Sequence, residues 1–204
     1  MTELAVLQAV RLKGRVSPAD LAATLGADLG DVVPIIERLT AEGMLSGSAT
    51  LRITGSGAGR LAVMLTEERE GIDSAAMAAA YDDFSVVNAD FKHLVTDWQL
   101  KGGPDGVPNA HDDADYDAAV LARLDGVHAR VIPIIEAAAA HLPRLSAYAA
   151  KLAAALDKVK AADTTWLTRP LIDSYHTVWF ELHEELIVAV GLTREEAARS
   201  GDGQ

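Results

Sequence analysis

Apolar residues in the first third of the chain recur at intervals of three and four, the period of an amphipathic helix. Three such stretches cover residues 4–11, 18–25 and 32–39, and a glycine follows each of them. Ser17 suits the N-cap of the second stretch, and Pro18 suits its first helical position. The pattern therefore predicts three short helices.

A short β-hairpin is predicted after the third helix. Residues 44–46 and 51–53 flank the small residues 47–49, as two strands flank a turn. The glycine-rich residues 55–59 come next. We interpret them as a flexible connection to the following helix.

Four longer helical patterns follow from Ser74 onward. They cover residues 74–100, 115–141, 145–162 and 169–190. Pro133 is expected to kink the second pattern, while Thr168 and Pro170 are expected to start the last one. Residues 101–115 are polar, contain glycine and proline, and form the most disorder-prone segment. This half of the chain is predicted to be an all-α helical bundle.

Charge divides the chain in a similar place. The sequence has 30 acidic and 18 basic residues and a net charge of -12, yet residues 1–66 carry six of each sign. The charged residues 67–71 mark either the expected junction or the solvated end of a helix that continues from Leu61. Half of the residues are hydrophobic but only 5% are aromatic, which favours helices. We predict a mainly α fold with two domains: residues 1–66, three helices plus a short β-hairpin, and residues 67–204, an all-helical domain.

Several classes of protein do not fit this composition. The absence of cysteine excludes disulfide bonds, thiolate zinc sites and a cysteine nucleophile. The start of the chain lacks the features of a secretory signal, and no stretch has the length of a membrane span, so we expect a cytoplasmic protein without a membrane partner. No spaced nucleophile, cofactor loop or metal motif is present, so we expect no enzyme activity, no cofactor and no metal.

The first third resembles a winged helix-turn-helix of the MarR-like kind. The resemblance covers residues 21–45 and 51–65, and residues 39–44 supply the family's turn after the recognition helix. Ile53-Thr54 and Gly59-Arg60 match its next helix start, with two extra residues between them. The resemblance implies a transcriptional regulator that binds double-stranded DNA as a homodimer, since such regulators usually read paired half-sites.

The resemblance and the distribution of charge together indicate which side chains face DNA. Six residues are expected to contact it: Arg11, Arg15, Arg38, Thr40, Arg52 and Arg60. The outward face of the third helix is poor in hydrogen-bond donors, and Asp31 and Glu37 would repel phosphates. Binding is therefore expected to be weak per domain and sensitive to salt. The alternative is a winged helix that binds protein, which would make the chain an accessory or regulatory module.

Residues 166–186 contain two of the three tryptophans and two of the six histidines. One hypothesis is a site for a small-molecule effector, and its residues are Trp166, Asp173, His176, Trp179 and His183. Asp173, His176 and His183 are expected to share one helix face, where they would also suit a metal. His93 or His128, from another helix, would be a further ligand. The competing interpretation is a hydrogen-bonded core network, which is the more usual role of such residues in a bundle.

The same segment is similar to the C-terminal part of actinobacterial proteins that carry a winged helix before it. Some of these proteins are associated with phosphoenolpyruvate-utilising dikinases. A link to a phosphoenolpyruvate-utilising enzyme therefore belongs to the alternative function, that of a protein-binding module. The chain has no Walker-type loop, because residues 55–59 lack a following lysine.

Overall fold

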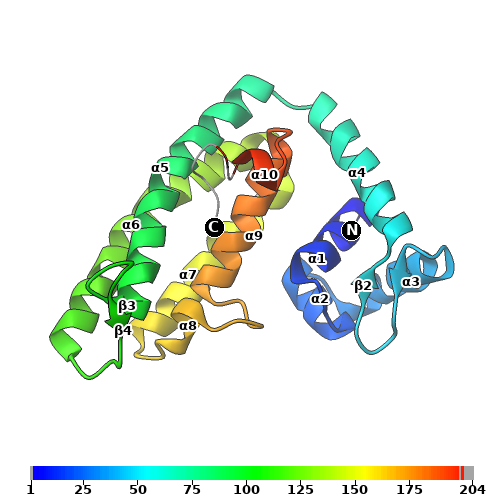
Figure 1. Cartoon of the computed structure of the whole chain (residues 1–204). Helices are drawn as coiled ribbons and strands as arrows, with labels where there is room; N and C mark the ends of the chain where they lie inside the picture. The colour runs from blue at the N-terminus through cyan, green and yellow to red at the C-terminus, as the bar shows by residue number, and fades with distance from the viewer. Residues whose placement is uncertain (1, 198, 200–204) are drawn as a thin grey trace. The chain divides into compact units, whose positions relative to one another are not determined.

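The computed structural model describes residues 2–197 and 199 (Figure 1). The fold is mainly α-helical, and the chain forms two compact units, Met1–Ile72 and Asp73–Gln204. The boundary expected at residue 66 falls inside the helix Gly55–Glu70, and the first unit ends two residues after that helix.

The first unit contains four helices and a hairpin. Its elements are α1 (Glu3–Lys13), α2 (Pro18–Leu25), α3 (Leu29–Ala41), β1 (Leu45–Ser46), β2 (Arg52–Ile53) and α4 (Gly55–Glu70). These include the three helices and the hairpin that the apolar pattern predicts. Ser17 caps α2 by accepting a hydrogen bond from the backbone N–H of Asp20 at 3.1 Å, and Gly26 ends the helix in the left-handed conformation.

The hairpin is extended by a third short segment. β1 and β2 are antiparallel, and Val16 pairs with Leu51 in an antiparallel bridge on the other side of β2. Val16 and Leu51 are buried, as are Leu7 of α1 and Leu39 of α3. Because α1 contacts α2, α3, α4 and β2, it lies at the centre of this unit.

The glycine-rich residues 55–59 are the first turns of α4, so the prediction of a flexible connection is wrong. Thr54 caps the helix by accepting a hydrogen bond from Gly57 N–H, and its hydroxyl donates to the carbonyl of Gly43 at 2.6 Å. A Cβ on Gly57 would lie 2.1 Å from the carbonyl oxygen of Met44. A glycine is therefore required here for close contact with the turn after α3.

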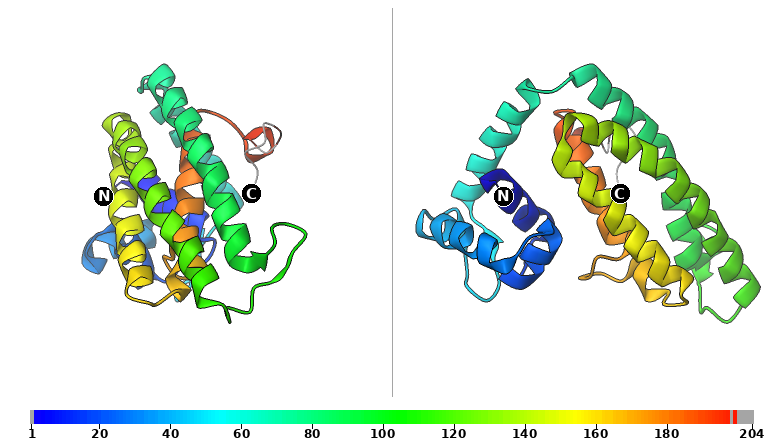
Figure 2. Two further views of the ribbon diagram at one scale, coloured as in Figure 1. Left: turned by 90° about the vertical axis from the view of Figure 1, so that its left-hand side faces the viewer. Right: turned by 180° about the vertical axis from the view of Figure 1, so that it is seen from behind.

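The second unit contains the remaining elements. They are α5 (Ser74–Gln99), β3 (Leu100–Lys101), β4 (Val107–Pro108), α6 (Ala114–His141), the 3₁₀ helix η1 (Pro143–Ser146), α7 (Ala147–Lys160), α8 (Thr165–Thr168), α9 (Tyr175–Ala189) and α10 (Arg194–Ala197). Figures 1 and 2 show α5, α6, α7 and α9 running alternately up and down, each beside the next, and α9 also contacts α5. This confirms the predicted helical bundle.

The predicted start of the last long helix is wrong. The last long helix begins at Tyr175, with Ser174 as its cap, and not near residue 169. Residues 165–168 form a separate short helix, and Pro170 leads into Leu171, whose φ of 67° is incompatible with a continuing helix. The segment 101–115, expected to be disorder-prone, contains β4, the second residue of β3 and the start of α6. α6 includes Pro133 within its span.

No helix among the described residues combines the length and the apolar character needed to cross a membrane.

We predict opposite effects of alanine at two glycines of α4. Gly57→Ala places a methyl group against the Met44 carbonyl and should lower the free energy of unfolding by about 1–3 kcal/mol. At Gly59 an added methyl group would have no neighbouring atom within 4 Å, so Gly59→Ala should raise the free energy of unfolding by up to about 1 kcal/mol. Urea denaturation of both variants measures this, and equal effects would contradict the close contact.

Candidate functional site

Two of the arginines expected to bind DNA are neutralised within the first unit. Arg38 Nη2 lies 3.0 Å from one carboxylate oxygen of Glu3, and Arg60 Nε lies 3.1 Å from the other. Arg38 also pairs with Glu42 at 3.0 Å. Burial raises the pKa of Glu3, but the hydrogen bonds from both arginines outweigh it and hold that pKa below its usual value. Glu3 is therefore ionised at neutral pH and offsets part of the basic charge.

Arg15 and Arg52 have a different environment. Arg15 directly precedes Val16 and Arg52 directly follows Leu51, so the antiparallel bridge between Val16 and Leu51 makes the two arginines neighbours along the backbone. Both side chains are exposed, and neither forms an ion pair with any residue that the structure describes. Like charges at opposed positions repel, so an anion bound between them would relieve the repulsion.

The other two predicted DNA contacts lie elsewhere in this unit. Arg11 is half-buried on α1, where its Nε donates to Gln8 at 3.0 Å. Thr40 is exposed on α3. The six residues thus form separate groups, of which Arg15 and Arg52 are the pair brought together without a carboxylate from the described residues.

The outward face of α3 borders a hollow of about 490 Å³. Its lining residues are Pro18, Val33, Ile36, Glu37, Thr40, Ala41, Gly47 and Ser48. The one charged side chain in this set is Glu37, and the set contains no arginine, lysine, asparagine or glutamine, the usual readers of base edges. This surface is therefore better suited to an apolar group than to a base pair.

In the second unit, the structure places Trp179 and His183 in the core of the bundle. Trp179 is fully buried, its ring centroid lies 4.4 Å from that of Phe91, and its indole N–H donates to Asn88 at 2.9 Å. His183 is also buried, with its ring 5.4 Å from that of Phe84. These contacts are those of a packed aromatic cluster with a satisfied polar group.

The other three residues of the predicted effector site lie in three different environments. Asp173 precedes α9, 4.0 Å from Lys151, and so does not lie one helical turn before His176. His176 packs near Phe91, and burial lowers its pKa below the usual value. Trp166 belongs to α8, where Lys158 Nζ lies 3.3 Å from its ring centroid. Among the described residues no three histidine, aspartate or glutamate side chains converge as a metal site requires.

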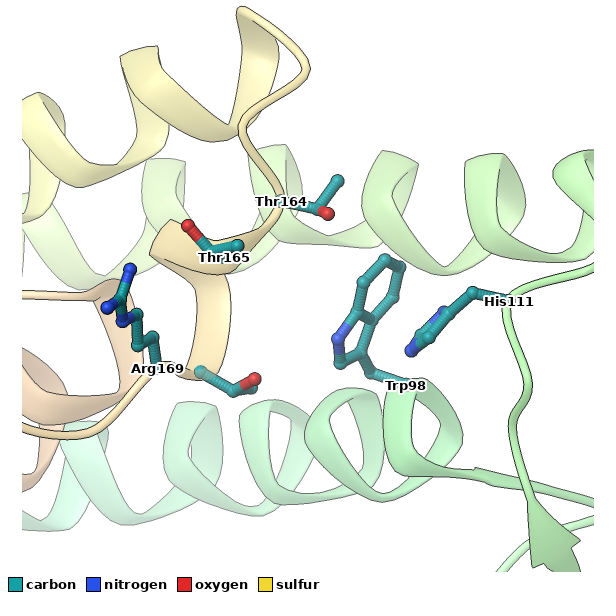
Figure 3. A pocket seen from close by; sticks show the side chains of 6 residues that line it. Trp98, His111, Thr164, Thr165 and Arg169 are labelled. Carbon is teal, nitrogen blue, oxygen red and sulfur yellow. The ribbon is translucent and has the colours of Figure 1, made fainter.

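A different hollow, which the sequence analysis missed, lies near α8. It has a volume of about 400 Å³ and is lined by Trp98, His111, Thr164, Thr165, Thr168 and Arg169. Figure 3 shows Trp98 and His111 on one side and the residues around α8 on the other. The sequence contains one local signal for this hollow, which is the presence of histidine, tryptophan and threonine near predicted helix ends. Residues 98–111 and 164–169 are too far apart in the sequence to suggest that they share a surface.

A hydrogen-bonded network fixes His111 at this hollow. Its Nδ1 lies 3.0 Å from one oxygen of Asp117, and Asn109 donates to the other at 2.9 Å. Burial raises the pKa of Asp117, but the hydrogen bonds from Asn109 and His111 outweigh it and keep that pKa below its usual value. Asn109 Nδ2 also lies 3.3 Å from His111 Nδ1, so Nδ1 is the ring nitrogen that this network holds.

Comparisons with known proteins identify no relative: no protein family, no curated protein and no solved structure matches the chain. The assignment of a function therefore rests on the geometry of the two units.

We predict that Trp179 is more important for stability than Trp166. Trp179→Phe removes the donor to the buried Asn88 and leaves space in the core, so it should lower the free energy of unfolding by about 2–4 kcal/mol. Trp166→Phe, the matched change at a partly exposed site, should cost at most about 1 kcal/mol. Thermal and urea unfolding compare the two, and an equal loss would argue against a core role for Trp179.

Proposed function

We propose that the protein is a DNA-binding transcriptional regulator, in which residues 2–72 act as a winged helix of the MarR-like kind. In this proposal the helical unit joins two subunits and holds a small-molecule effector. No catalytic step and no cofactor is part of it.

The observation that carries the proposal is the opposed pair Arg15 and Arg52. Two exposed guanidinium groups at positions that flank the Val16–Leu51 bridge, without a carboxylate partner among the described residues, suit a phosphate of the DNA backbone. Arg52 lies in the hairpin that corresponds to the wing of a winged helix. Contacts of this kind position a protein on DNA and carry no sequence information by themselves.

The order of elements also supports the proposal. A helix, an extended segment at Val16, the α2–α3 pair, a hairpin and a further helix follow in the order of a winged helix. Thr54, which belongs to the motif that resembles the family, joins the start of α4 to Gly43 at the end of the α3 turn. The two parts of that motif are thus in direct contact in the fold.

The charge distribution predicts that binding is weak. Glu3 offsets Arg38 and Arg60, and the whole chain has a net charge of -12. Most of the affinity for DNA comes from protein cations that displace counterions from phosphates. Because few unpaired cations remain in the first unit, the affinity should be low.

We predict that Arg52→Ala and Arg15→Ala weaken binding to all DNA sequences alike. Each change should lower the slope of log affinity against log salt by about 1, since one phosphate contact is lost. Glu3→Gln should strengthen binding severalfold, because it releases Arg38 and Arg60. Fluorescence anisotropy with labelled duplexes at several salt concentrations measures all three variants.

Arg130→Ala is the matched control, since Arg130 is an exposed arginine of the helical unit. Its affinity for DNA should equal that of the unmodified protein. If both Arg15→Ala and Arg52→Ala bind DNA as tightly as the unmodified protein, the short sheet is not part of the DNA-binding surface. That result would contradict the observation on which the proposal rests.

The hollow on α3 favours a second candidate function, a module that binds protein. An apolar surface on the helix that would read DNA suits a side chain of a partner protein better than a base edge. Ala41→Arg separates the two candidates. It adds a cation to the face of α3 and should raise affinity for DNA if α3 faces DNA, whereas a protein-binding module would remain without DNA affinity.

We also propose that the regulator is a homodimer. Val86 of α5, in the helical unit, is a large apolar side chain that is 62% exposed in the single chain, and a second copy could cover it. Light scattering at micromolar concentration should give twice the chain mass of 21.5 kDa. Val86→Glu should shift the mass toward one chain, and a mass of one chain for the unmodified protein would contradict the proposal.

A further inference from the structure

The loop between α8 and α9 presents a large apolar side chain to solvent. Leu171 is 99% exposed, more than any other large apolar residue that the structure describes. Arg169, which ends α8 (Figure 3), is also exposed and forms no ion pair with the described residues. A single exposed leucine is common on protein surfaces, so its significance depends on how the backbone holds it.

The backbone holds Leu171 from both sides. Pro170 precedes it with a φ that is fixed by the ring, and Ser174, which is fully buried, caps α9 after it. Between them, Asp173 lies 4.0 Å from Lys151 of α7. The φ of Leu171 is 67°, a strained value for a residue with a Cβ, and such values persist where the surroundings determine them. The loop is therefore pre-organised, and little ordering is needed when it binds.

The first unit contains a hollow of complementary character. The hollow on α3 has a volume of about 490 Å³, which is larger than a leucine side chain. Five of its eight lining residues are apolar or glycine: Pro18, Val33, Ile36, Ala41 and Gly47. Glu37 is the one charged residue of the lining, and it is exposed and forms no ion pair with the described residues. The hollow thus offers apolar walls beside a carboxylate.

The loop and the hollow match in polarity and in charge. Leu171 suits the apolar walls, and the positive charge of Arg169 suits the negative charge of Glu37. We propose that Leu171 of one chain docks in the hollow on α3 of a second copy of this chain, where Arg169 pairs with Glu37. Each chain carries one loop and one hollow, so two chains related by a two-fold axis satisfy both contacts. This contact is separate from the subunit contact at Val86 and does not require it.

The contact also regulates DNA binding, and this part rests on the proposed function. The hollow lies on the outward face of α3, which would face DNA, so a docked loop and DNA exclude each other. Because such coupling is reciprocal, DNA should also weaken the contact between the two copies. Self-association itself does not depend on DNA binding and is measured without it.

The test is sedimentation equilibrium of the full chain, without DNA, in a Val86→Glu background that removes the other subunit contact. Because one leucine fills one hollow, the contact is small and should appear only toward millimolar concentration. Leu171→Asn should weaken it about tenfold, since the apolar side chain is lost. Asparagine tolerates positive φ, so this variant keeps the loop. Val107→Asn, a similar change at a residue that is 67% exposed in the same unit, should leave self-association unchanged.

The ion pair is tested by exchanging its charges. Arg169→Glu and Glu37→Arg should each weaken self-association severalfold, because each brings like charges together. An equimolar mixture of the two variants should associate as tightly as the parent chain, since every loop then meets a hollow of opposite charge. This recovery requires a contact between copies. Arg15→Glu reverses another exposed arginine, outside the hollow, and should have no effect.

Three results would overturn the proposal: a mass of one chain at every concentration, equal association by Leu171→Asn, or a mixture of the reversed variants that associates no better than each variant alone. A change in the DNA affinity of Leu171→Asn without a change in mass would assign the loop to the hollow of its own chain and contradict a contact between copies.

Thermal unfolding shows whether each variant is folded. Leu171 is almost fully exposed, so Leu171→Asn should not lower the melting temperature. Recovery of association in the mixture, together with no effect of Arg15→Ala and Arg52→Ala on DNA affinity, would support this contact while contradicting the proposed function.

Discussion

The helical unit depends on the burial of α9, a helix that carries several polar residues among its buried ones. Eleven of its 15 residues are buried, including Glu181, His183, Glu184 and Glu185. Buried charge is costly unless it is paired, so neighbouring elements must supply partners. Arg144 of η1 and Tyr148 of α7 both bond Glu185, and Arg194 of α10 lies 3.3 Å from Glu184.

This requirement for partners fixes the order in which the helices pack. An apolar surface allows many alternative packings, but a buried carboxylate is satisfied only where its partner lies. The burial of Tyr148, with the nearby charges of Glu185 and Glu181, raises the pKa of its hydroxyl well above the usual value. Tyr148 therefore stays neutral and acts as a donor. The polar residues of α9 thus explain why it packs against α7, while Trp179 and Asn88 explain why it packs against α5.

Local signals in the sequence predicted much of the fold, because they act over a few residues. Ser17, Pro18 and Gly26 determine the ends of α2 without help from the rest of the chain. Gly57 could not be understood in this way, since its role depends on the Met44 carbonyl in another element. Pro170 is a local start signal as well, yet the chain turns at Leu171, and the capping by Ser174 determines where α9 begins.

The candidate sites were harder to predict because each depends on pairings between distant segments. Residue types indicated that Arg38 and Arg60 could bind phosphate, but the pairing of both with Glu3 follows only from the packing of α1 beside α3 and α4. The pairing of Arg15 with Arg52 follows from a single bridge between Val16 and Leu51. Net charge alone would treat these four arginines as equal. The fold divides them into two that are paired with Glu3 and two that have no ion-pair partner among the described residues, and net charge does not show this difference.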